Sequence, residues 1–233
     1  MEFLVAQILS GVSLGGQYAL IAIGYTMVYG ILRLINFAHG DVFMCAGLMM
    51  VFMCASLPVY VSIPLMLVLT VLLGFAIERA AYKPLRSAPR MSVMISAIGV
   101  SYLLQNLALL VFGPNPMSFP SFVSIPSISL FDGQLILTGE TIVTVLANII
   151  IMLVLTFFTS HTKMGKAMRA VSEDRSAAEL MGIKVNATIS LTFAIGSALA
   201  AIAGVLLCSA YPTLQPTTGS MPGIKAFTAA VFG

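Results

Sequence analysis

GKAMRAVSEDRSAAELMGIKV, residues 165–185, is a polar stretch between two apolar runs, and it decides the fold class. The runs at 142–159 and 189–210 carry no charged residue, and each has about the length that crosses a hydrocarbon core roughly 30 Å thick as a helix. The polar stretch contains four basic residues, Lys166, Arg169, Arg175 and Lys184. The positive-inside rule therefore predicts a cytoplasmic segment between two membrane spans.

The composition of the whole chain agrees with a membrane protein. Hydrophobic residues make up 59% of the sequence and charged residues 8%, and the mean hydropathy is +1.05. Soluble domains carry about 25% charged residues, which excludes that class. A membrane β-barrel is excluded too, because its strands would be alternating segments of about 10 residues. The fold class expected is all-α, a polytopic transmembrane helical bundle.

The apolar runs predict one transmembrane domain over residues 1–233. Its spans are expected at about 5–32, 42–57, 59–77, 91–112, 142–159 and 189–210, with the start of another near 223–233. Because the sequence stops within an apolar helix, we expect a chain truncated at its C-terminus.

The distribution of basic residues predicts the orientation. Nine of the eleven Lys and Arg lie in 79–90 and 163–184, so 79–90 and the segment 161–187 are expected in the cytoplasm. The loop 113–139 has no Lys or Arg and is expected outside. The location of the N-terminus stays open. Two full crossings over 42–77 place it outside, and a broken or re-entrant element over 31–56 places it inside.

Motifs for catalysis and cofactor binding are missing from the sequence. The Gly165–Lys166 pair is followed by Ala167 and lacks the preceding glycine of a phosphate-binding loop, so any ATP hydrolysis belongs to a partner. The three cysteines lie in apolar runs without metal-ligand spacing. We therefore expect no enzyme activity, cofactor or metal, and no nucleic-acid binding.

The segment INFAHGD, residues 35–41, interrupts apolar sequence with three polar side chains. One interpretation is a broken helix lining a translocation path, with Asn36, His39 and Asp41 meeting solute or backbone groups. The other is a cytoplasmic hairpin in which Asn36 or Asp41 caps a helix and Gly40 makes the turn. We favour the hairpin.

Ser101 and Gln105 in the fourth predicted span are four residues apart, and therefore lie on one helical face. We favour interhelical hydrogen bonds for this pair over contact with solute.

A short helix is predicted near 173–181 within the cytoplasmic segment. Ser172 or Asp174 suits its N-cap, and Gly182 suits the left-handed position after its C-terminus. The pair Ala177–Ala178 is expected to leave room for the wall of a groove on another protein.

Six separated motifs resemble the permeases of branched-chain amino acid ABC importers, most closely the H-type subunit of leucine/isoleucine/valine uptake systems. The motifs are NFAHGD (36–41), ERAAYKPLRS (78–87), ISAIG (95–99), MGKAMRAVSEDRSAAELMGI (164–183), FAIGSALAAIAGVLL (193–207) and GIKAFTAAVFG (223–233).

The resemblance implies a multi-pass permease of a bacterial inner membrane with several partners. These are a second related permease subunit, two cytoplasmic ATPase subunits, an extracytoplasmic binding protein, an amino acid substrate and the lipid bilayer. It also implies that the cytoplasmic segment couples to the ATPase through residues matching a Glu-Ala-Ala-like motif: Glu173, Asp174, Ala177, Ala178 and Gly182.

Two alternative functions remain open from the sequence. A permease of the same family for urea, short amides or another amino acid is one, because the sequence places no charged residue clearly in the path. An ion-coupled secondary transporter or channel is the other, and it would need paired intramembrane acids.

Overall fold

The computed structural model describes residues 2–32, 36–86, 88–118, 128–130, 135–137, 139–210 and 212–232. The long helices are α1 (Glu2–Leu32), α2 (His39–Cys54), α3 (Val59–Ile77), α4 (Arg90–Phe112), α5 (Gly139–His161), α8 (Val185–Ala210) and α9 (Ser220–Phe232). Shorter elements are the π-helix η1 (Glu78–Tyr82), α6 (Lys163–Glu173), α7 (Arg175–Leu180), β1 (Met117–Ser118), β2 (Ile128–Leu130), β3 (Leu135–Leu137) and β4 (Thr213–Leu214).

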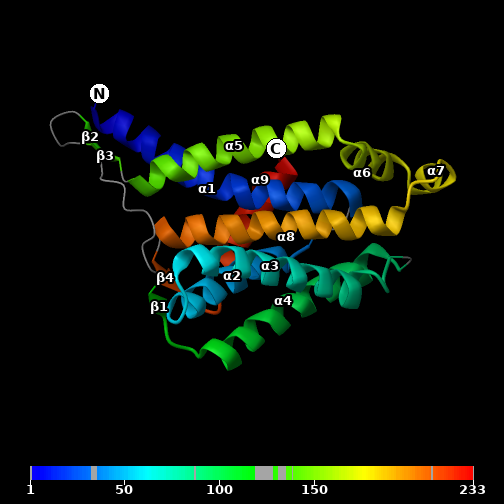
Figure 1. The fold of residues 1–233 in the computed structure, drawn as a ribbon, viewed down its shortest axis with the longest axis horizontal. Helices are drawn as coiled ribbons and strands as arrows, with labels where there is room; N and C mark the ends of the chain where they lie inside the picture. The colour runs from blue at the N-terminus through cyan, green and yellow to red at the C-terminus, as the bar shows by residue number, and fades with distance from the viewer. Residues whose placement is uncertain are drawn as a thin grey trace.

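The helices form an elongated bundle around α8 (Figure 1). Within the apolar windows of the two helices, 61% of residues are buried for α8 and 6% for α5, so α8 is central and α5 peripheral. Helix α8 packs against α1, α2 and α3. Four helices in the described part of the chain are long and apolar enough to cross a membrane: Val59–Tyr82, Met91–Phe112, Ile142–His161 and Val185–Ser209.

The two ends of the bundle differ in character. Helices α6 and α7 lie at one end, and the strands lie at the other with the N-terminus (Figure 1). Strand β1 pairs antiparallel with β4, and β2 with β3. The predicted loop 113–139 holds the first three of these strands, and its residues 119–127, 131–134 and 138 lie outside the described part.

The direction of α1 places the N-terminus opposite the polar segment. Arg175, the first residue of α7, donates a hydrogen bond from Nη2 to the carbonyl oxygen of Ile31 at 3.3 Å. The C-terminal end of α1 therefore lies beside α7, and the helix runs away from it toward the strands (Figure 1). The described start of α1 therefore lies at the end of the bundle opposite the basic segments, and the sequence-based expectation of basic segments in the cytoplasm corresponds to an N-terminus outside.

Helices α2 and α9 begin inside the bundle. A Cβ on Gly24 would lie 2.6 Å from His39 Nε2, and a Cβ on Gly196 would lie 3.9 Å from His39 Cε1. Gly24 lies about 12 Å before the end of α1 and Gly196 about 16 Å after the start of α8, at 1.5 Å per residue. His39, the first residue of α2, is therefore near the middle of the bundle.

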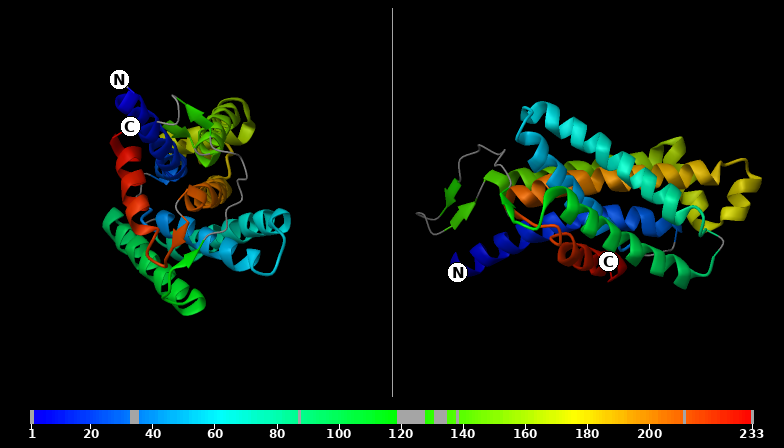
Figure 2. Two further views of the ribbon diagram at one scale, coloured as in Figure 1. Left: turned by 90° about the vertical axis from the view of Figure 1, so that its left-hand side faces the viewer. Right: turned by 90° about the horizontal axis from the view of Figure 1, so that it is seen from below.

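The start of α9 meets the start of α2 at the same depth. A Cβ on Gly40 would lie 2.8 Å from the Cα atom of Gly223, which is closer than any side chain permits. Glycine at these positions lets the two backbones touch, and α9 continues alongside α1 (Figure 2). Two helix N-termini thus face each other within the membrane region.

The predicted cytoplasmic loop 79–90 needs one correction. Residues 78–82 do not form a loop but extend α3 as η1, so the helical segment runs to Tyr82. Residues 78–83 contain no glycine or proline, so the backbone continues as helix beyond the end of α3. A π-helical turn of this kind is frequently found at functional sites.

Candidate functional site

A pocket of about 230 Å³ lies where α2 and α9 begin. Its walls come from α1, the residues before α2, and the helices α2, α4 and α9. The lining residues are Tyr25, Phe37, Asp41, Ile98, Ser101, Tyr102, Gln105, Ser220, Gly223 and Ile224. Four polar side chains from these helices thus meet in a mostly apolar bundle: Asp41 of α2, Ser101 and Gln105 of α4, and Ser220 of α9.

Asp41 is the centre of the polar side of this pocket. Gln105 donates from Nε2 to Asp41 Oδ1 at 3.0 Å and lies 3.2 Å from Ser220 Oγ, and the Ser101 hydroxyl donates to Asp41 Oδ2. Interhelical hydrogen bonding by Ser101 and Gln105 is therefore confirmed. The same groups also line the pocket, so the two interpretations of this pair do not exclude each other.

Two details of the favoured hairpin interpretation of residues 35–41 are wrong, although the chain does turn at residues 37–38 and α1 and α2 run in opposite directions (Figure 1). The N-cap residue of α2 is Ala38, without a side-chain hydrogen bond, and Gly40 lies inside the helix. Asn36 and Asp41 cap nothing, because each is buried against another helix: Tyr82 donates to Asn36 Oδ1 at 2.6 Å, and Asp41 meets α4. Residues 36–38 lead into the bundle, where α2 begins at His39. Residue 35 lies outside the described part.

The structure separates the three polar residues of this segment. Only Asp41 lines the pocket. His39 is 2% exposed and its ring lies 4.7 Å from the ring of Tyr25, centroid to centroid. Asn36 is bound to Tyr82 near the cytoplasmic end. His39 and Asn36 therefore hold the interrupted segment in place, while Asp41 faces the ligand space.

The chemistry of the pocket suits a small zwitterion with an aliphatic group. An ionised Asp41 carboxylate binds a cation such as an ammonium group. The N-terminal ends of α2 and α9 carry partial positive charge, which favours an anion such as a carboxylate. Phe37, Ile98 and Ile224 supply apolar contact area. Among the described residues no group of three or more acids, cysteines or histidines is placed to hold a metal ion.

The cytoplasmic segment ends in the short helix α7, with the local chemistry that the sequence predicts. Of the two candidate caps, Asp174 fills the role: its Oδ1 accepts from the backbone N–H groups of Ser176 at 2.8 Å and Ala177 at 3.1 Å. Gly182 has φ +83°, a left-handed conformation that favours glycine. Its N–H donates to the Glu179 carbonyl, and that of Ile183 to Ala178, which is a Schellman motif.

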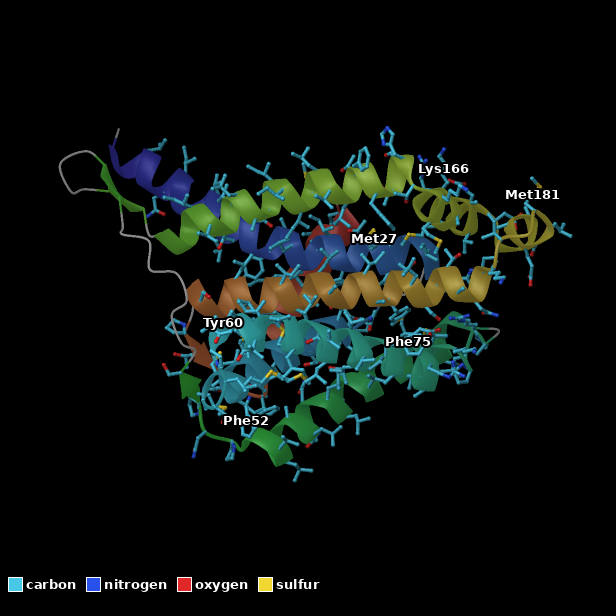
Figure 3. The ribbon with its side chains drawn as sticks, in the orientation of Figure 1. Met27, Phe52, Tyr60, Phe75, Lys166 and Met181 are labelled. Atoms are coloured by element: carbon cyan, nitrogen blue, oxygen red, sulfur yellow. The ribbon has the colours of Figure 1, made fainter. Side chains whose placement is uncertain are left out.

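One residue of α7 is placed differently from its prediction. Ala178 is 4% exposed and packs into the protein's own core, so it offers no room for a partner. The exposed apolar groups are Leu180 and Met181, at 89% and 83%. Figure 3 shows Met181 at the far tip of the end of the bundle that carries α6 and α7. Which side of a six-residue helix meets the core depends on tertiary packing that local sequence does not encode.

Glu78, Arg86 and Ser190 form a buried polar network that the sequence interpretation missed. Glu78 is 1% exposed, pairs with Arg86, and accepts from Ser190 Oγ at 2.9 Å. Arg86 also donates to Asn186 at the start of α8. The network ties the end of α3 to the beginning of α8, directly after α7. The sequence signal was a lone acid at the end of an apolar run.

Removing Glu78 is expected to destabilise this end strongly. Glu78→Ala removes the carboxylate that neutralises Arg86, which typically costs about 3–5 kcal/mol and lowers the unfolding midpoint by about 10 °C. Ser190→Ala removes one hydrogen bond and is expected to cost about 1 kcal/mol. Thermal unfolding of the purified protein in detergent measures both. Equal midpoints for the two variants would show that the ion pair is not a structural link.

Lys225 is a second residue that the sequence interpretation left without a role. It lies in α9 with Nζ 5.3 Å from the ring centroid of Tyr18, which is near the middle of α1. A cation at this depth is stabilised by the electron-rich face of an aromatic ring.

Comparison with known proteins agrees with this architecture. The model of the family "Branched-chain amino acid transport system / permease component" matches residues 7–233. Similar proteins are the high-affinity branched-chain amino acid transport system permease protein LivH of Salmonella typhimurium, 42% identical over 99% of this chain and 79% of its own length, and LivH of Escherichia coli K12, 41% identical over the same shares.

The corresponding protein BraD of Pseudomonas aeruginosa is 41% identical over 97% of this chain and 78% of its own length. No solved structure matches the chain. The family match covers almost the whole sequence, including every helix that lines the pocket. The chain therefore belongs to the family of permease components of branched-chain amino acid transport systems.

Proposed function

We propose that this chain is the membrane-spanning subunit of an ATP-binding cassette importer that translocates branched-chain amino acids across a bacterial inner membrane. The observation that carries the proposal is the pocket at the meeting point of α2 and α9. Interrupted helices that begin at mid-membrane form the substrate sites of many transporters, because their N-termini face anionic groups of the substrate. Relatives at 41–42% identity are named for branched-chain amino acid transport.

The pocket gives each part of a branched-chain amino acid a partner. Asp41 is proposed to bind the ammonium group, and the first turn of α9 around Ser220 the carboxylate. Ile98 and Ile224 are proposed to contact the aliphatic side chain. Gln105 Nε2 lies 3.0 Å from Asp41 Oδ1 and 3.2 Å from Ser220 Oγ. We propose that it fixes the distance between these two side chains.

The coupling element is proposed to be α7 with the turn that follows it. Glu173, Asp174, Ala177 and Gly182 are exposed at the cytoplasmic end, beside Leu180 and Met181. An apolar tip stabilised by an N-cap and a Schellman turn can enter a groove on an ATPase without rearranging its backbone. Ala178 contributes by fixing α7 to the bundle rather than by touching the ATPase.

The Glu78 network is proposed to transmit the movement of α7 to the pocket. It binds the start of α8 to the end of α3, and Tyr82 of the same π-helical turn holds Asn36. Asn36 precedes α2, whose third residue is Asp41. A displacement of α7 thus has a continuous packed route to the pocket.

The proposed assembly contains a second related permease subunit, two ATPase subunits and an extracytoplasmic binding protein. ATP binding would switch the pocket between outward-open and inward-open states, while the binding protein delivers the substrate. The proposed transport function is tested by uptake of labelled leucine into vesicles that contain the complete importer. Uptake is expected to require ATP and loaded binding protein. Uptake driven by an ion gradient without ATP would refute the proposal.

A further inference from the structure

A second cavity lies between α1, α5 and α6, away from the pocket around Asp41. It has a volume of about 330 Å³. Its lining residues are Ile23, Thr26, Met27, Gly30, Ile31, Met152, Leu155, Thr156, Thr159, Met168, Arg169 and Ser172. We refer to this cavity as the α1–α5 groove. None of its lining residues belongs to the pocket around Asp41.

The groove lies at the depth of the cytoplasmic leaflet. Ile23 is nine residues before the end of α1, or about 14 Å at 1.5 Å per residue. Half of a hydrocarbon core is about 15 Å thick, so the groove extends from the membrane middle to the cytoplasmic surface. Helix α5 is almost entirely on the outside of the bundle, and the groove opens beside it.

The part of the groove that lies between α1 and α5 offers few free polar groups to a ligand. Three threonines line it, and each donates its hydroxyl to a backbone carbonyl of its own helix: Thr26 to Ala22 at 2.8 Å, Thr156 to Met152 at 2.8 Å and Thr159 to Leu155 at 2.8 Å. These hydroxyls need no further acceptor from a ligand. The remaining surface in the membrane is mostly methionine, leucine and isoleucine, which suits a hydrocarbon chain.

The mouth of the groove carries a positive charge, because Arg169 of α6 lines it and is exposed. Arg169 Nη2 also donates to the Ser160 carbonyl at 3.4 Å. Lys163 and Lys166 are exposed on the same helix but do not line the groove. Glu173, at the last position of α6, is the acid nearest to them along this helix. Figure 3 shows Lys166 on α6 and Met27 on α1 at this end of the bundle. Basic pockets between membrane helices at the cytoplasmic side bind anionic lipid headgroups.

An apolar groove with an arginine at its mouth matches a molecule that combines a hydrocarbon chain with an anionic group. We propose that the α1–α5 groove binds an anionic phospholipid of the cytoplasmic leaflet, with one acyl chain along Met27, Met152 and Leu155 and the phosphate at Arg169. The site is independent of the substrate pocket and places a lipid directly beside the segment that leads into α7.

The test uses the complete importer in vesicles that contain phosphatidylglycerol with a diazirine in one acyl chain. Photolysis followed by peptide mass spectrometry is expected to place adducts within residues 23–31 and 152–159. Excess unlabelled phosphatidylglycerol is expected to suppress these adducts about fivefold more than phosphatidylcholine, since one basic contact contributes about 1 kcal/mol. Arg169→Gln is expected to abolish that difference.

Gly30→Leu supplies the variant that fills the groove. Gly30 lines the groove and a Cβ there meets no atom within 4 Å, so a leucine side chain starts in open space and is expected to extend into the cavity. Gly11→Leu is the matched control, because Gly11 lies on the same helix, also has no atom within 4 Å, and does not line the groove. Labelling is expected to fall in Gly30→Leu alone.

Three results would overturn the lipid site. One is labelling of Gly30→Leu as strong as that of the unmodified chain. Another is equal competition by phosphatidylcholine, which would leave a hydrophobic surface without headgroup recognition. The third is the absence of groove adducts in an importer that is labelled elsewhere, which would show that a neighbouring subunit covers the groove. Leucine uptake, measured in parallel, separates this outcome from a failure of the proposed transport function.

Discussion

Asp41→Asn is expected to reduce ATP-dependent leucine uptake by about 100-fold, because truncating one member of a desolvated charge pair typically costs about 2–5 kcal/mol. Asparagine has nearly the same shape and keeps an oxygen for the Gln105 amide, so the interhelical contact survives. What is lost is the negative charge that faces the substrate ammonium. The measurement is uptake of labelled leucine into vesicles containing the complete importer.

Two variants control for a general effect on the bundle. Asp41→Glu keeps the charge and is expected to retain more uptake than Asp41→Asn. Asn106→Leu changes an amide on α4 one position after Gln105, where the side chain is exposed and donates to the Tyr102 carbonyl. It is expected to transport normally. Full uptake by Asp41→Asn would remove Asp41 from the substrate site.

The double variant Leu180→Asp/Met181→Asp is expected to lower co-purification of the ATPase subunits by at least about 30-fold. Both side chains are more than 80% exposed at the tip of the cytoplasmic segment. Apolar anchors at the centre of an interface typically contribute about 2 kcal/mol or more each, and a buried carboxylate adds a desolvation cost. Affinity purification of the assembled importer, followed by quantification of its subunits, gives the result.

Two further variants distinguish the apolar contact of the α7 tip with the ATPase from the conformation of the turn that follows α7. Leu180→Met keeps an apolar tip and is expected to retain the ATPase. Gly182→Val meets no neighbouring atom within 4 Å, so its whole effect comes from the left-handed φ of +83°, and it is expected to weaken the association. Ala178→Trp is unsuitable as a test of docking, because Ala178 is buried in the protein itself. Normal ATPase content in the double variant would make α7 a simple connector.

Local sequence signals were sufficient for α4, α5 and α8 and for the ends of α7. Charge-free apolar runs of membrane-spanning length marked α4, α5 and α8 closely, because the bilayer fixes the length that a span requires. The capping carboxylate of Asp174 and the left-handed Gly182 act within a few residues of their own position. Such interactions are encoded where they occur, and sequence analysis can recognise them.

The pocket depends on contacts between distant parts of the chain, which sequence alone did not predict. Gly40 looked like a turn residue, yet it is a helical position where the backbone of α9 approaches, and its partner Gly223 lies more than 180 residues away. Asp41 was considered beside Asn36 and His39 because they are neighbours in sequence. In the structure its partners are Ser101, Gln105 and, through Gln105, Ser220.

The most direct test of the central claim is to trap a photoreactive leucine analogue in the working importer. The analogue carries a diazirine in its side chain, is delivered by the binding protein, and is photolysed during turnover. Peptide mass spectrometry is predicted to find the adducts on residues 98–105 of α4 and 220–224 of α9, the two walls that carry the apolar side chains of Ile98 and Ile224. Adducts confined to other surfaces of this chain, with none around Ile98 or Ile224, would contradict the proposed substrate site.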